Sequence, residues 1–294
     1  MKKWPNLSIV IATYNNIKTL EKVISAMLNL EYPSQYEVIV VDDGSTDNTK
    51  NIIREKYGKN KKIKLISLPH AGVCKARNAG INASKNEIII NMDHDCIPIK
   101  TWALDLVKDF NSKEIGVVSS YGYYGGTSTA FKRDLLKKVG GYDEEYKYYR
   151  EDTDLSFKIM ELGYKFKLVN AKYEHDHKAV KPKGLIGLTK YVLQRLKYHT
   201  NDALLYKKHP NELCKKFLHV KGGFFVNPLE DFRVATGLWN EKGNFNLSSP
   251  RGITFIENKS PLHALMIVLG GTLYVILVKT ARLYGSIKFG KLLV

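Results

Sequence analysis

The chain has 294 residues, of which 44% are hydrophobic, and its formal net charge is +17. A chain of this length and composition can bury a sizeable core, which excludes wholesale disorder and fits one large domain or one domain with an appendage. The three cysteines, Cys74, Cys96 and Cys214, lie far apart, so neither a disulfide framework nor a zinc module is expected, and a reducing compartment fits best. The charge leaves three candidate partners: nucleic acid, an anionic membrane or a phosphorylated substrate.

The first half of the sequence alternates strand-like and helix-like segments. Apolar, β-branched runs predict strands at residues 7–12, 37–41, 62–68 and 87–91. Helix-spaced apolar residues predict helices at residues 18–30 and 73–83, and a third helix that Ser45 or Asp47 caps and that runs to Tyr57. Strands of this kind with helical crossovers predict an α/β fold, a Rossmann-like, mostly parallel sheet with helices on both faces.

Polar residues follow three of these strands where each strand ends. Thr13, Tyr14 and Asn15 follow the first strand, Asp42 and Asp43 the second, and Asp93 and Asp95 the fourth. Ligands of such sheets bind beyond the carboxyl ends of the strands, so we expect these side chains on one rim that forms a binding site.

The carboxylates of this rim indicate two kinds of chemistry. Asp93 and Asp95, two positions apart at a strand end, can hold a hard divalent cation that also binds substrate phosphates, although the same pattern occurs by chance in solvated loops. Asp43 can accept a hydrogen bond from the imino N–H of uracil, thymine or guanine, whereas cytosine and adenine offer no donor there. The alternative for Asp43 is a turn residue, because Asp-Gly is a turn dipeptide.

Further acidic residues and histidines come later in the chain. Glu151 and Asp152 precede a predicted helix, where acidic residues are also ordinary capping chemistry. Residues 165–173 predict a strand that ends at two histidines, His175 and His177, either of which could complete a metal site shared with Asp95. A single histidine at such a place is more often a surface residue.

As an ordered set, these motifs resemble the inverting family 2 glycosyltransferases of the GT-A fold. The resemblance rests on residues 8–15, 40–47, 72–80, 93–95, 140–143 and 151–152, and on a histidine near position 175. It covers roughly residues 7–178 and fades beyond them, which predicts a nucleotide-sugar-binding and catalytic domain at 1–178 and a C-terminal helical region at 179–294.

The resemblance implies a role for each matching residue. It implies that Asp43 binds the nucleotide base, within a donor site that Thr13, Tyr14 and Asn15 also line. It implies that the acidic pair binds Mn²⁺ or Mg²⁺ and the diphosphate, with Asp95 as the direct ligand and Asp93 nearer the ribose. It implies that Asp152 is the general base and that Glu151 orients the acceptor or the base. Arg77 would approach the diphosphate or pin its loop against the sheet.

The charge excess belongs to the C-terminal third. Residues 178–221 hold eleven basic and two acidic side chains, and residues 279–294 hold four basic side chains and no acidic one. Residues 185–206 predict a basic amphipathic helix, and residues 262–278 form an uncharged run that is short for a membrane span. We expect an in-plane helix or a re-entrant hairpin on an anionic membrane surface rather than a simple span, with a buried core helix as the alternative.

The sequence therefore predicts a metal-dependent inverting glycosyltransferase, peripheral or monotopic on the cytoplasmic side of the cell membrane. Its donor would be a UDP-, GDP- or dTDP-sugar, and its acceptor a hydroxyl, plausibly on a lipid-linked glycan. One alternative is a polyprenyl-phosphate glycosyltransferase, whose acceptor needs no base. A nucleic-acid-binding protein is the alternative from another class, and it is disfavoured because the rim is acidic and the basic residues lie beside apolar helices.

Overall fold

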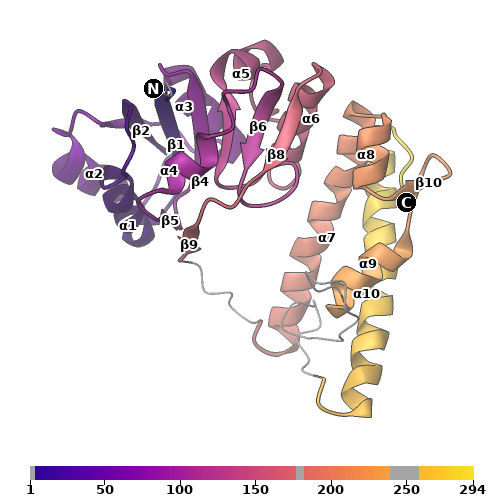
Figure 1. Cartoon of the computed structure of the whole chain (residues 1–294). Helices are drawn as coiled ribbons and strands as arrows, with labels where there is room; N and C mark the ends of the chain where they lie inside the picture. The colour runs from indigo at the N-terminus through magenta and orange to yellow at the C-terminus, as the bar shows by residue number, and fades with distance from the viewer. Residues whose placement is uncertain (1–3, 177–181, 239–257) are drawn as a thin grey trace. The chain divides into compact units, whose positions relative to one another are not determined.

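The computed structural model describes residues 4–176, 182–238 and 258–294. The chain divides into two compact units, Met1–Lys178 and Ala179–Val294, each described here by itself. Figure 1 follows both units from the N-terminus to the C-terminus.

A seven-stranded sheet forms the centre of the first unit, in the order β3-β2-β1-β4-β7-β6-β8. Its strands are β1 (Leu7–Thr13), β2 (Tyr36–Asp42), β3 (Ile63–Ser67), β4 (Ile88–Asp93), β6 (Ile115–Ser119), β7 (Thr129–Lys132) and β8 (Lys165–Leu168). Strand β7 is antiparallel to both of its neighbours, and all other pairs in this sheet are parallel. The predicted mostly parallel sheet is confirmed.

Six helices lie in the described part of this unit, residues 4–176. They are α1 (Ile17–Leu28), α2 (Thr49–Tyr57), α3 (Val73–Ala83), α4 (Trp102–Val107), α5 (Arg133–Val139) and α6 (Glu151–Glu161). Alternate residues of β1 face opposite layers, as the strand period requires. Ile9 and Ile11 belong to a core cluster with residues of α1 and α4, whereas Val10 faces α3. Helix α3 approaches the sheet closely at Gly80, where an added Cβ would lie 2.3 Å from the Val10 side chain.

Two details of the predicted elements were wrong. Helix α2 begins at Thr49 with Asn48 as its N-cap, and Asp47 accepts a hydrogen bond from the Thr49 amide in the preceding turn. The strand predicted over 165–173 is broken: β8 ends at Leu168, and Ala171 further along packs into the core cluster of the unit. The chain then forms β9 (Tyr173–His175), which pairs with β5 (Cys96–Pro98) in a separate two-stranded sheet.

The three polar strand ends lie on one rim, as predicted. Thr13 is paired with Asp42 between β1 and β2, and Ala12 is paired with Asp93 between β1 and β4. Parallel pairing in this register brings the residues after each strand to the same edge of the sheet.

The second unit is mainly helical. Its elements are α7 (Gly184–Lys208), α8 (Glu212–Phe217), the hairpin strands β10 (Val220–Lys221) and β11 (Phe225–Val226), α9 (Pro228–Thr236) and α10 (Pro261–Phe289). The apolar run predicted to form a helix is therefore part of a longer one. Helix α10 is the one helix in the described part of the chain that is long and apolar enough, by length and composition, to cross a membrane.

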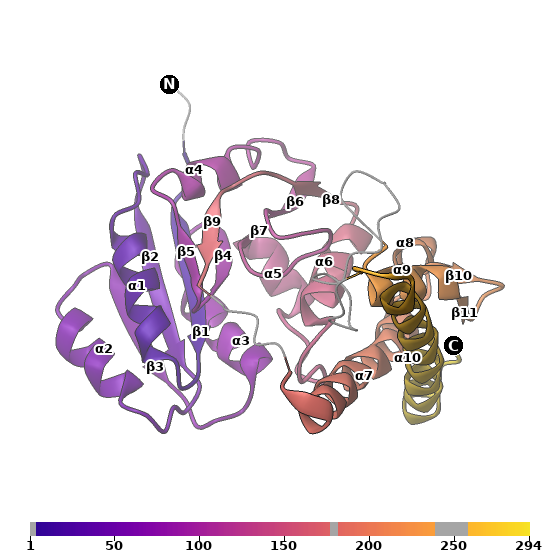
Figure 2. The same cartoon turned by 90° about the horizontal axis from the view of Figure 1, so that it is seen from below.

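Helices α7 and α10 lie side by side and run in the same direction (Figures 1 and 2). Leu188 and Gly270 line one small cleft near the start of both helices, and Asp202 meets Arg282 further along both. The Arg282 guanidinium also bonds to Asp231 of α9, at 2.5 and 2.9 Å. These buried ion pairs join the three helices.

Candidate active site

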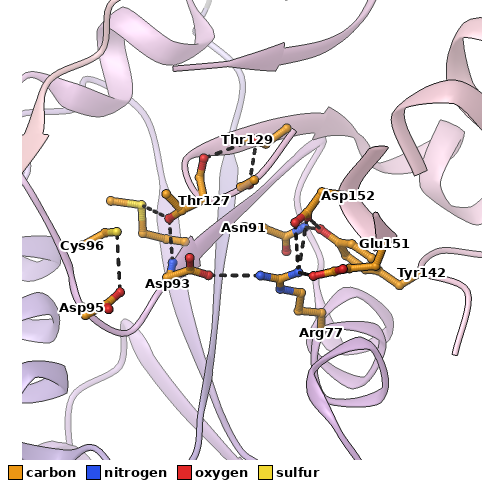
Figure 3. Close-up of polar contacts among 12 residues, drawn as sticks. Arg77, Asn91, Asp93, Asp95, Cys96, Thr127, Thr129, Tyr142, Glu151 and Asp152 are labelled. Atoms are coloured by element: carbon orange, nitrogen blue, oxygen red, sulfur yellow. Dashed lines mark hydrogen bonds and ion pairs between the residues drawn. The ribbon is translucent and has the colours of Figure 1, made fainter. Parts of the chain in front are cut away.

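A buried arginine joins three carboxylates at the rim of the sheet (Figure 3). Arg77 of α3 is 7% exposed, and its Nη2 atom donates to Asp93 Oδ1 at 3.1 Å. Its Nη1 atom lies 3.4 Å from Glu151 Oε1 and 3.3 Å from Asp152 Oδ1. One guanidinium therefore holds together residues that the sequence placed at a strand end and at a helix start.

Burial has opposite consequences for the members of this cluster. Desolvation, together with the charge of Asp152, raises the pKa of Glu151 to about 7. Burial opposes the charged form of Arg77, but the adjoining carboxylates outweigh it and raise the pKa of the guanidinium, which stays protonated. The second oxygen of Glu151, Oε2, is buried and has no hydrogen-bond partner among the residues that the structure describes.

Tyr142 orients Asp152. Its hydroxyl donates to Asp152 Oδ1 at 2.8 Å, and Asn91 Nδ2 donates to the same hydroxyl at 2.5 Å. The side-chain amide of Asn78 fixes the Tyr142 backbone, because it accepts from the Tyr142 N–H and donates to the Tyr142 carbonyl. Burial raises the pKa of Tyr142, so this hydroxyl keeps its proton and remains a donor.

A pocket of about 600 Å³ opens beside the ends of β1 and β2. Its lining includes the predicted residues Thr13, Tyr14 and Asp43. His70, which was not predicted, stacks on Tyr14 with ring centroids 4.2 Å apart and an angle of 26° between the planes. Lys147 and Tyr148 also line the pocket and were not predicted. No sequence pattern marked these residues, because they reach the pocket from loops that are distant in sequence.

Asp43 is buried at the wall of this pocket. Its two carboxylate oxygens accept from the backbone amides of Ala71 and Gly72, each at 2.9 Å, and Oδ2 lies 3.0 Å from His70 Nδ1. A carboxylate has about four acceptor positions, so these bonds orient Asp43 without exhausting its capacity. The arrangement is compatible with one further donor from a ligand.

Two predicted donor-site residues have different surroundings. The Asn15 side chain is turned toward the loop after β2. Its Oδ1 accepts from the amides of Thr46 and Asp47, and the Asn15 backbone N–H donates to Ser45 Oγ. It thus joins the loop after β1 to the loop after β2. The hydroxyl of Thr13 is buried and has no hydrogen-bond partner among the described residues.

The pairing of β5 with β9 brings Asp95 and His175 together. Cys96 is paired with His175, and His175 Nε2 lies 3.4 Å from Asp95 Oδ2. Potential ligand atoms of Asp95, Cys96 and His175 lie within 4.8 Å of one another. Burial raises the pKa of the Cys96 thiol to about 12, so it remains a neutral thiol and a poor ligand for a hard cation.

A carboxylate and an imidazole that meet across two strands fit Mn²⁺ or Mg²⁺ as a partial ligand set. Such a site would leave coordination positions for the oxygens of a substrate phosphate. Asp93 is instead paired with Arg77. His177, the other predicted ligand, lies outside the described residues.

The sequence model described as "Glycosyl transferase family 2" matches residues 8–177, which is more than half of the chain.

Curated relatives agree with this family. The chain is 29% identical over 206 residues to a probable glycosyltransferase, YdaM, of Bacillus subtilis, covering 56% of this chain and 49% of the relative. It is 33% identical over 194 residues to a beta-monoglucosyldiacylglycerol synthase of Nostoc, and the match covers 53% of this chain and 41% of the relative. The chain thus spans about half the length, or less, of these relatives.

A solved structure resembles most of the chain. It is a mannosyltransferase from Pyrobaculum calidifontis in complex with GDP-Man and Mn²⁺, with a TM-score of 0.61 at 19% identity, covering 95% of this chain and 87% of that one. At this identity the likeness shows the fold, which is GT-A. The sequence family, the sheet and the acidic rim agree, and the chain belongs to glycosyl transferase family 2.

Proposed function

We propose that this glycosyltransferase moves a sugar from a UDP-, GDP- or dTDP-sugar to an acceptor hydroxyl, with inversion at the anomeric carbon. The observation that carries the proposal is Asp152, a carboxylate held by Arg77 and Tyr142 and still 17% exposed. A general base needs this combination of fixed orientation and access to the substrate.

The donor would occupy the pocket beside β1 and β2. Asp43 is oriented by backbone amides and retains acceptor capacity for the imino N–H of uracil, thymine or guanine. The stacked rings of Tyr14 and His70 offer an aromatic surface beside it. Asp95 and His175 would hold the divalent cation, which supplies charge neutralisation for the departing diphosphate when it is bound.

Transfer then requires one displacement. The acceptor oxygen forms a bond to the anomeric carbon while the bond to the nucleoside diphosphate breaks, and the acceptor proton passes to Asp152. Displacement from the opposite face inverts the configuration. Arg77 and the Tyr142 hydroxyl keep the carboxylate turned to one orientation, which limits the entropy lost on reaching the transition state.

A sugar acceptor is consistent with the surface beside Asp152. The loop between β6 and β7 approaches this carboxylate so closely that an added Cβ on Gly125 would lie 2.9 Å from the Asp152 Cβ. The same loop exposes Tyr121 and Tyr123, which are 60% and 69% accessible. Exposed tyrosine rings provide flat apolar faces with a polar edge, a surface suited to a glycan.

The C-terminal unit supports a membrane-bound acceptor, such as a lipid-linked glycan on the cytoplasmic face. Helix α10 is long and apolar enough to cross a membrane, and large apolar side chains such as Leu269 and Leu273 are exposed on it. The basic residues of 178–221 and 279–294 complement anionic headgroups.

A nucleoside diphosphate release assay tests the proposal, with a panel of donor sugars and Mn²⁺. We expect release from one donor in the absence of acceptor. Asp152→Asn should lower transfer to a hydroxyl acceptor by about 10²–10⁴-fold, whereas Asp134→Asn, a change at an exposed carboxylate on α5, should not. Near-normal turnover of Asp152→Asn would remove the base role and favour a polyprenyl-phosphate acceptor.

A further inference from the structure

Helix α10 has two opposite faces with different surroundings. The residues buried against the rest of the second unit are Ile267, Gly271, Tyr274, Val278, Arg282, Gly285, Ser286 and Phe289. The large side chains exposed by more than two fifths are Leu262, Leu265, Met266, Leu269, Leu273, Ile276, Leu283, Tyr284 and Ile287. At about 100° per residue, the centres of these two sets lie almost opposite each other around the helix axis.

We name the second set the α10 apolar stripe. The stripe continues about two and a half helical turns beyond the uncharged run that ends at Val278, since Leu283, Tyr284 and Ile287 are 44%, 63% and 77% exposed. Lys288 is exposed about a quarter turn from the centre of the stripe. Lys279, about a quarter turn away on the other side, is turned into the unit, where its ammonium donates to the Val226 carbonyl and its side chain is 15% exposed. The helix contains no acidic residue.

The buried face argues against a span of the bilayer. Arg282 Nε bonds to Asp202 of α7 at 3.0 Å, and the Arg282 side chain is 4% exposed. An added Cβ on Gly285 would lie 2.5 Å from the Thr200 carbonyl oxygen of α7. Helix α7 therefore has to accompany α10 wherever α10 goes.

Helix α7 carries charges that hydrocarbon does not accept. Lys190, Arg195 and Lys197 are exposed along its length beside α10. If α10 crossed the membrane, these cations and the buried Asp202 would enter the bilayer with it, at a high cost. With α10 parallel to the surface, its stripe meets the acyl boundary and the cations of the unit stay at headgroup level.

We propose that α10 lies in the plane of an anionic membrane, with the α10 apolar stripe buried in one leaflet over its whole length. The proposal rests on the membrane partner proposed above and specifies how that partner is bound. Lys288 lies beside the stripe where anionic headgroups would lie, and Tyr284 places a ring with a hydroxyl at the same level. A second copy of the helix is a poorer occupant, because α10 would bring the exposed cation Lys288 and no carboxylate to its partner.

Fluorophore depth distinguishes an in-plane helix from a span. The native cysteines are all buried, so single cysteines introduced by Leu265→Cys, Leu273→Cys and Ile287→Cys can carry an environment-sensitive label in the full chain. The vesicles contain phosphatidylglycerol and phosphatidylcholine with quenchers at shallow or deep positions. We expect similar shallow quenching at all three sites. Deep quenching at Leu273 with a water-exposed label at Ile287 would overturn the proposal in favour of a span.

Binding affinity gives a second test. Ile287→Glu and Leu273→Glu should each weaken vesicle binding by about tenfold or more. Each change replaces an apolar side chain that the proposal buries in the membrane leaflet. Gln194→Glu, which adds the same charge at an exposed site on α7, should change binding by less than about threefold. Unchanged binding of Ile287→Glu contradicts the proposal, and so does concentration-dependent dimerisation that these variants abolish in the absence of vesicles.

Donor hydrolysis in solution keeps this inference separate from the proposed function. Each variant should release nucleoside diphosphate at the rate of the unmodified chain, since the stripe lies outside the catalytic unit. A chain that binds vesicles as described but hydrolyses no donor would contradict the proposed function and leave the in-plane helix supported.

Discussion

The hydroxyl of Tyr142 donates a 2.8 Å hydrogen bond to Oδ1 of Asp152. Tyr142 is 2% exposed, and the hydroxyl itself accepts from the side-chain amide of Asn91. The two bonds together link Asn91, near the end of β4, through the buried Tyr142 ring to Asp152 at the start of α6. The orientation of Asp152 is therefore determined by the core of the domain.

The change Tyr142→Phe tests this relationship. It removes the donor to Asp152 and leaves the Asn91 amide without that partner, while the ring still fills its site. We expect kcat for sugar transfer to fall by about tenfold or more, with little change in the KM for the donor, because the pocket around Asp43 is untouched. Steady-state kinetics with one donor and one acceptor measure both constants. A raised donor KM with an unchanged kcat would contradict a role in orienting Asp152.

A second prediction concerns Arg77 and stability. Arg77→Ala would leave Glu151 and Asp152, which are 6% and 17% exposed, and the more exposed Asp93 without their shared cation. We expect the free energy of unfolding to fall by about 3–5 kcal/mol, as is typical when one member of a buried ion-pair network is removed. Urea unfolding followed by circular dichroism measures this value. Lys75→Ala, an exposed change on the same helix, should stay within about 0.5 kcal/mol of the unmodified chain.

The sequence predicted the shared rim because strand direction determines where strand ends lie. Residues after β1, β2 and β4 had to share a rim once these strands were parallel, so Asp43, Asp93 and Asp95 could be placed together. The sequence also predicted that a histidine near position 175 meets Asp95, and His175 lies 3.4 Å from it. The ion pair between Asp93 and Arg77 was not predicted, because it depends on side-chain packing between segments distant in sequence.

The strand break after Leu168 shows the same limit. An apolar pattern over residues 165–173 favours one strand, but β8 ends at Leu168, Ala171 packs into the core, and the chain pairs with β5 from Tyr173 onward. The Tyr142 bond was also missed, although the motif at residues 140–143 was noted. That motif identifies a segment, and only the folded core shows that its tyrosine reaches Asp152.

A third prediction separates the candidate metal ligands. Asp95→Asn should weaken Mn²⁺ binding by about tenfold or more, because it removes a carboxylate charge from the ligand set. His175→Ala should weaken it as well, since His175 lies 3.4 Å from Asp95. Electron paramagnetic resonance of free Mn²⁺ in the presence of donor measures the affinity without relying on activity.

The matched variant for this test is His177→Ala, two residues further along the chain. If His175→Ala binds Mn²⁺ normally and His177→Ala does not, the histidine ligand is His177. Unchanged Mn²⁺ affinity in Asp95→Asn would contradict the assignment of the acidic pair.

The last prediction is a pH dependence of stability from Glu151. Burial raises the pKa of this carboxyl from 4.5 to about 7, so between these two values the folded state holds a proton that the unfolded state has lost. The stability that this proton contributes is fully present below about pH 4.5 and is lost as the pH rises through about 7. Glu151→Gln should remove this dependence, because an amide stays neutral throughout.

Urea unfolding of both proteins at several pH values between about 5 and 8 measures the effect. The free energy of unfolding of the unmodified chain should fall relative to that of Glu151→Gln across this range, by an amount on the order of 3 kcal/mol. Subtracting one protein from the other cancels the titration of the remaining groups. A difference that stays constant with pH, or that grows in favour of the unmodified chain as pH rises, would mean that Glu151 is ionised in the fold at pH 5, and that Arg77 rather than burial controls its charge.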